Sequence, residues 1–216
     1  MSLQVMMREL GEGMLKSMGI FSLTLLFALP LGLLVSFGRM SKNRLLKGVV
    51  WTYISIMRGT PLMLQLLAVY FGPFYLAGLK LGPNWRFTAI ILAFSVNYAA
   101  YFAEIYRSGI ESMPPGQHEA AQLLGYTKVS TFMRIIFPQV IKRILPAITN
   151  EVITLIKDTS LAFSLAYAEM FTIAKQIAAK ETSFMPFLAA AAFYYIFNAI
   201  VAFLMERIEK AMAYYT

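Results

Sequence analysis

The sequence predicts an all-α integral membrane protein with five transmembrane helices. Hydrophobic residues make up 59% of the 216 residues and charged residues 14%, and this composition is too apolar for a soluble domain of this length. The charges are also spread unevenly, because long stretches without charge alternate with short basic segments. The chain has no cysteine and one histidine, so we expect neither a disulfide framework nor a thiolate or histidine-rich metal site.

Four stretches without Asp, Glu, Lys or Arg mark the clearest spans, since about 20 apolar residues cross a bilayer as a helix. They cover residues 17–38, 59–79, 87–103 and 182–205. A fifth apolar stretch is interrupted by Glu151, Lys157 and Asp158. We count it because the chain must cross again to bring its basic segments to one side. The expected spans are about 17–38, 48–79, 87–106, 144–168 and 183–205.

The elements follow in order along the chain. Residues 1–16 are predicted to form a short amphipathic helix on the membrane surface, because apolar residues recur there at helical spacing between charged ones. The second span is interrupted by a helix break, since proline cannot continue a helix. The break comprises Arg58, Gly59, Thr60 and Pro61. A kink with a snorkelling arginine is a plainer reading of the same residues, and the two readings are compatible.

The loops between the later spans are predicted from turn residues and charge. Residues 71–85 are rich in glycine and proline and are expected to be a turn. Residues 169–182 are expected to be a polar return on the side opposite the basic segments. Basic segments 39–47, 107–143 and 207–210 hold eleven lysines and arginines, whereas the opposite side holds six. The positive-inside rule therefore predicts an outside N-terminus and a cytoplasmic C-terminus.

Residues 114–138 are a polar segment between the third and fourth spans. Pro114 and Pro115 cannot continue a preceding helix, so we expect a new helix whose first turn lies at residues 119–121. Gly125 suits the position after that helix, because a left-handed conformation costs glycine little. Thr127 is expected to cap a second helix over residues 128–137.

Pro138 is then expected to break or kink the chain. The fixed residues of this segment are Glu119, Ala120, Ala121, Gly125, Ile135 and Pro138, in the pattern E-A-A-x3-G-x9-I-x-F-P. This pattern resembles the signature loop of permease subunits of binding-protein-dependent ABC importers, E-A-A-x3-G-x9-I-x-L-P. The one departure is Phe137, which keeps a large apolar group. The plainer alternative is an ordinary amphipathic connector between two membrane helices.

Two further stretches of the sequence narrow the resemblance to one group within this family. RGTPLMLQLL, residues 58–67, and NEVITLIKDTSLA, residues 150–162, resemble segments of permeases for polar amino acids. The resemblance implies that residues 114–138 form a cytoplasmic coupling loop, whose short helix docks in a groove of a separate ATPase. It also implies one permease domain, residues 1–216, in the cytoplasmic membrane of a prokaryote.

The resemblance further implies the partners. They are two ATP-binding subunits, a second permease chain that is identical (a homodimer) or closely related, an extracytoplasmic solute-binding protein, an amino acid and the lipid bilayer. No nucleic acid is expected among them. The chain lacks the phosphate-binding pattern G-x-x-x-x-G-K-[ST], so it is expected not to be an enzyme or to hold a cofactor. ATP and magnesium would be bound by the partner.

Polar residues within the spans form the candidate substrate path. These are Asn97, Glu104, Glu151, Asp158, Thr159 and Ser160. Carboxylates at membrane depth are costly unless they face a cavity, form a pair or meet a cation. Their acidic excess favours arginine, lysine or histidine as substrate. Alternatively, Asp158 pairs with Lys157 or Arg58, and Glu104 lies beside Arg107.

A second function class remains open from the sequence alone. In a stand-alone pore or a proton- or cation-coupled secondary carrier, Glu104, Glu151 and Asp158 would carry the ions. The expected number of spans and the resemblance of residues 119–138 to an ATPase-docking loop favour the importer.

Overall fold

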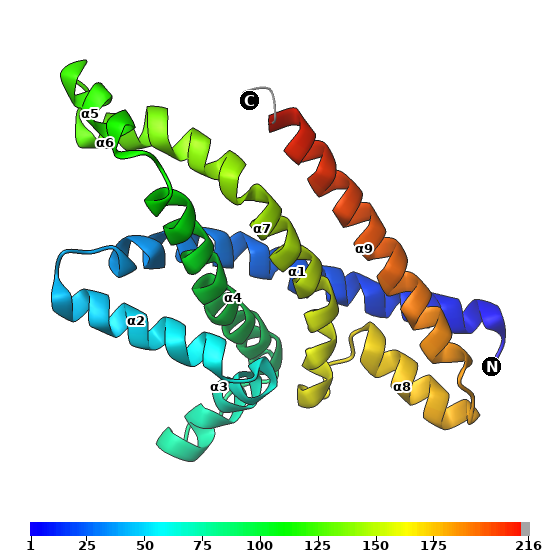
Figure 1. Cartoon of the computed structure of the whole chain (residues 1–216). Helices are drawn as coiled ribbons and strands as arrows, with labels where there is room; N and C mark the ends of the chain where they lie inside the picture. The colour runs from blue at the N-terminus through cyan, green and yellow to red at the C-terminus, as the bar shows by residue number, and fades with distance from the viewer. Residues whose placement is uncertain (213–216) are drawn as a thin grey trace.

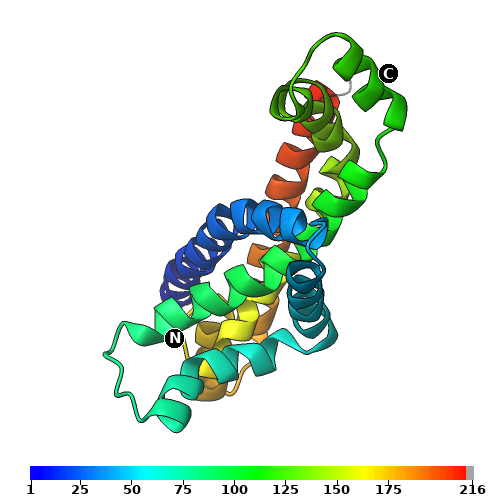
Figure 2. The ribbon, with the colours of Figure 1, turned by 90° about the vertical axis from the view of Figure 1, so that its left-hand side faces the viewer.

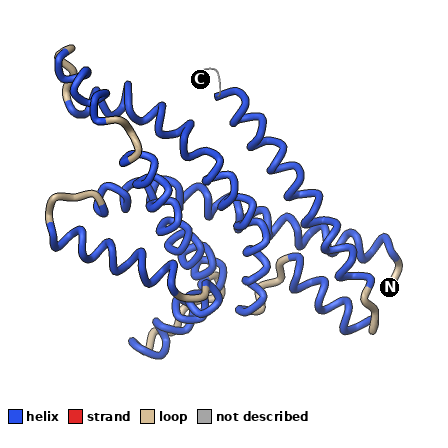
Figure 3. Tube along the Cα trace, in the orientation of Figure 1, coloured by secondary structure: helices blue, strands red, loops and turns tan. Residues whose placement is uncertain are grey.

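The computed structural model describes residues 1–212, and all regular structure in this range is helical. Figure 3 shows the helices joined by short loops. The elements are α1 (Leu3–Arg39), α2 (Arg44–Gly59), α3 (Leu62–Ala77), α4 (Trp85–Glu111), α5 (Pro115–Leu123), α6 (Lys128–Thr131), the π-helix η1 (Phe132–Ile136), α7 (Phe137–Asp158), the 3-10 helix η2 (Thr159–Leu165), α8 (Met170–Glu181) and α9 (Met185–Met212).

Three described helices are long and apolar enough to cross a membrane, namely α1, α4 and α9. The pair α2 and α3 makes a fourth if it is counted as one bent span. The helix expected as the fourth span, α7, does not meet this test, because charges interrupt its apolar run. It also ends at Asp158, and the expected span 144–168 continues as the 3-10 helix η2.

Residues 1–16 do not form the separate surface helix that we expected. Residues 3–16 belong to α1, which is one helix of 37 residues with Ser2 as its N-cap. Met6, Leu10 and Met14 are buried against Met170 and its neighbours on α8, so the apolar face of this segment contacts protein. At Gly13 a Cβ atom would lie 2.7 Å from the Cα of Met170. The absent side chain therefore allows α1 and α8 to approach closely.

The centre of the molecule is the contact between α1 and α4 (Figure 1). Phe94, Tyr98 and Phe102 on α4 are buried, as is Ala28 on α1. A Cβ atom at Gly32 would lie 2.8 Å from the Cβ of Phe102. Small residues at such crossings let helix backbones come close enough for van der Waals contact, which replaces the hydrophobic driving force that is absent in lipid.

The predicted helix break lies at Thr60 and Pro61, where α2 and α3 meet at a bend of 111°. Arg58 and Gly59 are still helical, contrary to the wider break that we expected. Thr60 is extended because a following proline disfavours the α conformation. The expected turn at residues 71–85 is also shorter, since α3 continues to Ala77.

Pro138 does not break the helix as predicted, because the chain remains helical on both sides of it. The preceding residues form the π-helix η1, in which the N–H of Phe137 donates to the carbonyl of Phe132. Pro138 then lies in the first turn of α7, directly after this π-helix. Proline has no N–H to donate, and the regular hydrogen-bond ladder is already altered at a π-helical turn. Residues 169–182, expected as a polar return, form α8 with Glu169 as its N-cap.

The two ends of the molecule carry different elements. Figure 2 shows α5, α6 and the end of α9 at one end, while α3 and α8 lie toward the other. The predicted cytoplasmic residues 114–138 and the end of α9 therefore lie at the same end of the molecule.

Candidate functional site

The segment α5–α6 follows α4 as a short helix, a turn and a second helix. Helix α5 begins at Pro115, whose fixed φ suits the first helical position. Glu119 is therefore the fifth residue of α5 and does not lie in its first turn, contrary to the sequence-based expectation. Ala121 is buried, whereas Glu119 and Ala120 are exposed.

The turn between the two helices has the predicted caps. Gly125 has a φ of 78°, a left-handed conformation that favours glycine. Its N–H donates to the carbonyl of Gln122 at 3.0 Å, and the N–H of Tyr126 donates to the carbonyl of Ala121 at 3.0 Å. The hydroxyl of Thr127 accepts from the N–H of Ser130 at 3.2 Å. These local bonds hold the turn in one conformation.

An exposed apolar surface surrounds this turn. Leu123 is 90% exposed, Leu124 75% and Val129 73%. Exposed leucines of this kind, clustered on a short helix, are typical of a surface that another protein covers. The last two residues of the pattern lie outside this surface: Ile135 is in η1 and partly buried, and Pro138 is in the first turn of α7 and exposed.

Two side-chain contacts join α5 and the end of α4 to α7. Gln117 on α5 and Gln139 on α7 exchange two amide hydrogen bonds of 2.7 and 2.8 Å. Arg143 on α7 donates to the carbonyl and the hydroxyl of Ser112 at 2.6 and 2.9 Å. These bonds tie α5 and the end of α4 to α7, which carries two of the candidate path carboxylates.

The structure places Asn97 at the helix break. Its Nδ2 donates to the Met57 carbonyl at 3.0 Å and to Oε1 of Gln65 at 2.9 Å. Nε2 of Gln65 in turn donates to the carbonyls of Met57 and Thr60 at 3.0 and 3.2 Å. Asn97 and Gln65 thus satisfy the backbone groups freed by the break, and Asn97 has a structural contact there.

Glu104 lies among arginines from three helices. Arg107 donates to it at 2.7 Å, and Arg39 and Arg58 lie 3.8 and 4.0 Å away. The guanidinium of Arg58 also lies over the ring of Tyr101, 5.4 Å from its centroid. This arrangement agrees with the alternative in which Glu104 lies beside Arg107, and it gives one carboxylate three nearby cations.

Glu104 and Glu151 line one open cleft of about 490 Å³ between α4 and α7. Arg58, Arg107 and Arg143 line it as well. The cleft thus presents charged groups of both signs.

The other four path residues, Asn97, Asp158, Thr159 and Ser160, do not line this cleft. Asp158 accepts a hydrogen bond from the hydroxyl of Tyr98 at 2.7 Å, and no ion pair within 4.0 Å joins it to Lys157 or Arg58 in the described chain. Thr159 and Ser160 donate to the carbonyls of their own helical turns, at 2.7 and 2.8 Å. The structure therefore brings Glu104 and Glu151 together, while Asn97 and Asp158 are held at other contacts.

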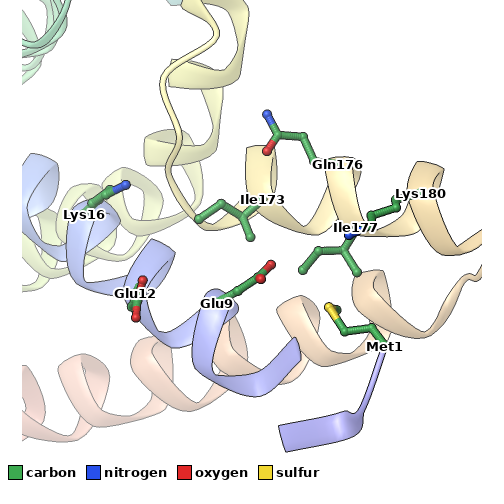
Figure 4. Close-up of a pocket in the computed structure, with 8 residues that line it drawn as sticks. All are labelled: Met1, Glu9, Glu12, Lys16, Ile173, Gln176, Ile177 and Lys180. Carbon is green, nitrogen blue, oxygen red and sulfur yellow. The ribbon is translucent and has the colours of Figure 1, made fainter. Parts of the chain in front are cut away.

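A second groove, of about 410 Å³, lies between α1 and α8. Figure 4 shows the carboxylate of Glu9 pointing into it, toward Ile173 and Ile177. The N-terminal ammonium group donates to Glu181 at 2.6 Å nearby. Within residues 1–212, no group of three or more His, Cys, Asp or Glu side chains could hold a metal ion.

The comparisons with known proteins identify the family. A family model described as "Binding-protein-dependent transport system inner membrane component" matches residues 28–214, most of the chain. The chain belongs to this family. It is therefore an inner membrane component of a bacterial transport system, and the family that the sequence resembles is confirmed.

Relatives of this inner membrane component cover nearly its whole length. The putative glutamine transport system permease protein GlnP of Rickettsia conorii is 37% identical over 93% of this chain and 91% of its own length. The L-cystine transport system permease protein TcyB of Bacillus subtilis is 35% identical over 95% and 87%. The arginine transport system permease protein ArtQ of Bacillus subtilis is 34% identical over 93% and 91%.

Solved structures agree with the fold of this inner membrane component. A chain of the crystal structure of an amino acid ABC transporter with histidines superposes with a TM-score of 0.85 and 32% identity, over 94% of both chains. A chain of the MetNI methionine ABC transporter in an inward-facing conformation has a TM-score of 0.78 and 20% identity over 99% of this chain. The second likeness shows the fold alone.

Sequence reasoning missed the most buried acid of this inner membrane component. Glu169 has 0% exposure. Its carboxylate accepts from the N–H groups of Phe171 and Thr172 at 2.8 and 2.7 Å, and from the hydroxyls of Ser17 and Tyr194 at 3.4 and 3.3 Å. It thus joins α1, α8 and α9. Its position directly before the helical residues from Met170 onward could have indicated this role, because a carboxylate is favourable at a helix N-terminus.

Proposed function

We propose that the chain is the permease subunit of an ATP-driven importer of polar amino acids. The observation that carries this proposal is the identity of 34–37% to permease proteins named for glutamine, L-cystine and arginine, over nearly the whole chain. The structure with 32% identity is likewise described as an amino acid ABC transporter. Glu104, Glu151 and the arginines around them supply charged groups of both signs for such a substrate.

The energy for transport would come from a partner. The proposal takes α5 as a cytoplasmic coupling helix, with Leu123, Leu124 and Val129 as the apolar surface that meets an ATPase. ATP and magnesium would be bound by that ATPase, and this chain would bind no cofactor. The Gln117–Gln139 and Arg143–Ser112 bonds support this role, because they join the segment to α7.

The topology and assembly are part of the proposal. Five spans, with α7 and η2 as the fourth, would place the N-terminus outside and α5–α6 in the cytoplasm with the C-terminus. A single chain of this size can hardly enclose a solute path, so two permease chains, identical or closely related, would pair about a two-fold axis. Two ATPase subunits and an extracytoplasmic solute-binding protein would complete the complex.

The finer substrate proposal is a cationic amino acid. Glu151 lines the open cleft, and a carboxylate there would favour arginine, lysine or histidine over glutamate. Asp158, held by Tyr98 about two helical turns beyond Glu151, would act on the same path.

Reconstituted uptake tests both levels of the proposal. Proteoliposomes containing this chain, its ATPase and its binding protein should take up amino acids only with ATP, and wild type should prefer arginine to glutamine and glutamate. Glu151→Gln and Asp158→Asn should lower the preference for arginine, whereas Glu12→Gln, outside the cleft, should not. Solute flux through this chain alone would instead support a pore or secondary carrier. Unchanged arginine preference in both variants would leave these two carboxylates with a structural role.

A further inference from the structure

The segment that joins α1 to α2 carries positive charge without compensation. Arg39, Lys42, Arg44 and Lys47 lie within nine residues, and no acidic residue lies among them. Arg39 is near Glu104, at 3.8 Å. The other three cations are exposed, and none of them forms an ion pair within 4.0 Å in the described chain. Arg44 and Lys47 also begin α2, where the helix dipole disfavours cations.

Apolar side chains are exposed on the same turns of α2. Leu45 is 77% exposed, Val49 60% and Trp51 55%. Figure 1 shows α2 at the periphery of the molecule, and Ile54 is its one buried residue. We call Lys42, Arg44, Leu45, Lys47, Gly48, Val49 and Trp51 together the basic-apolar surface.

A shallow groove of about 420 Å³ runs across this surface. Arg44 lines it together with Leu45, Gly48, Val49 and Thr52. At Gly48 nothing lies within 4 Å of the position of a Cβ atom, so the missing side chain leaves the groove open. Arg44 therefore lies beside a groove whose other walls are the apolar Leu45 and Val49, the open position at Gly48, and Thr52, whose hydroxyl already donates to the carbonyl of Gly48.

We propose that the basic-apolar surface binds an anionic phospholipid. The headgroup phosphate would lie against Arg44, between Lys42 and Lys47, and an acyl chain would follow Leu45 and Val49 across Gly48. Two chemical features of the surface require this ligand class. Three unpaired cations attract an anion, and the exposed apolar residues need a hydrocarbon partner that a soluble anion lacks.

The depth of the surface fits this ligand. Residues 17–38 carry no charge and are long enough to cross the hydrocarbon core. Arg39 follows them directly, so the cations begin where the apolar run ends, at the level of the lipid headgroups. Trp51 suits the same level, because tryptophan is enriched at membrane interfaces.

A second copy of the chain fits the surface less well. In a two-fold symmetric contact the same patch meets itself, so Lys42, Arg44 and Lys47 of one copy would face those of the other. Like charges brought together in this way repel each other, whereas an anionic lipid neutralises them.

Native mass spectrometry with defined lipids tests the proposal. Purified protein is incubated with an equal mixture of phosphatidylglycerol, phosphatidylcholine and phosphatidylethanolamine of the same acyl chains. Wild type should retain phosphatidylglycerol preferentially. Combined Lys42→Gln, Arg44→Gln and Lys47→Gln should lower that preference roughly tenfold or more, since each cation contributes separately to attraction. Gly48→Leu keeps the charges but fills the groove, and should also lower retention.

A matched variant separates local binding from net charge. Lys80→Gln, Lys175→Gln and Lys180→Gln together remove the same charge from exposed lysines elsewhere, and should leave the preference unchanged. Inorganic phosphate at millimolar concentration should not displace the lipid. Equal retention of the three lipids by wild type, or an equal loss in the matched variant, would overturn the proposal. A changed oligomeric mass in the first triple variant, with lipid retention intact, would assign the surface to a contact between copies.

Discussion

Glycine is required at two positions of the structure, Gly125 and Gly13, for two different reasons. Gly125 is required by its backbone, because its φ of 78° lies in the left-handed region. Gly13 is required by its neighbours, because a Cβ atom would meet the backbone of Met170 at 2.7 Å. The two requirements differ physically, so substitutions at the two positions should have different effects.

Gly125→Val should abolish ATP-driven uptake while the protein still inserts. A β-branched residue in the left-handed conformation costs about 1–2 kcal/mol or more, which should misplace the turn after α5. Uptake in proteoliposomes and membrane insertion would be measured together. Gly82→Val is the control, because Gly82 has no positive φ and open space around it. Full uptake by Gly125→Val would show that the turn does not transmit the ATPase step.

Gly13→Ala should lower the melting temperature of the purified protein. The added methyl group overpacks the crossing of α1 and α8, at a cost of about 1–3 kcal/mol. Gly19→Ala lies on the same helix with nothing within 4 Å of its Cβ position, and should be neutral or stabilising by up to about 1 kcal/mol. Equal melting temperatures for the two variants would contradict the close contact at Gly13.

At the scale of the elements, two polar contacts fix how helices are joined. Asn97 on α4 and Gln65 on α3 satisfy the backbone at the break between α2 and α3. Gln117 and Gln139 join α5 to α7. The first contact supports the bend, whereas in the proposed function the second would carry movement of α5 to α7.

Asn97→Leu should destabilise the bend between α2 and α3. It removes a donor from the carbonyl of Met57 and leaves part of the amide of Gln65 unpaired, at a cost of about 1–3 kcal/mol. Thermal unfolding in detergent would measure the loss. Asn84→Leu is the matched control, since the side chain of Asn84 makes no capping bond and is exposed. A melting temperature equal to that of wild type would remove Asn97 from this structural role.

Gln139→Ala should uncouple ATP hydrolysis from uptake. Without the two amide bonds, α5 can still meet the ATPase through Leu123 and Leu124 but no longer moves α7 with it. The expected result is retained ATP turnover with reduced uptake per ATP. Gln122 is an exposed residue of α5 itself. Gln122→Ala should therefore change neither ATP turnover nor uptake per ATP. A parallel loss of both activities in Gln139→Ala would indicate damage to docking itself.

At the scale of the whole molecule, the described chain leaves much of its apolar surface uncovered. Along α9, Tyr195 is 75% exposed and Ile196 57%, and of the three long apolar helices α9 is the least buried. Lipid or a second permease chain must cover such a surface. We therefore expect the exposed apolar surface of α9 to be covered by lipid or by a second permease chain.

Native mass spectrometry of the active complex should show two permease chains and two ATPase subunits. The reason is that one chain with at most a few spans can hardly enclose a path, and a two-fold axis gives each α5 one ATPase. Complex prepared with Leu123→Lys, which places a charge on the 90% exposed residue of the docking surface, should lose ATPase subunits but keep both permease chains. An active assembly with one permease chain would refute this stoichiometry.

The sequence by itself determined the features that depend on local chemistry. The helical membrane class follows from composition, the caps at Gly125 and Thr127 follow from turn chemistry, and the break before Pro61 follows from the steric effect of proline. Each involves residues close in sequence. Of the break or kink predicted at Pro138, the break is absent, because the chain stays helical through the π-helix before it, which shifts the hydrogen-bonding register.

Only the tertiary structure decided which distant residues meet. It merged residues 3–16 into α1 because α8 covers their apolar face. It also assigned Asn97 to the helix break, Glu104 to three arginines and Glu169 to a buried cap. The physical reason is that helical periodicity shows which residues share a face, but not which helix that face will contact. That choice depends on the packing of side chains far apart in the sequence.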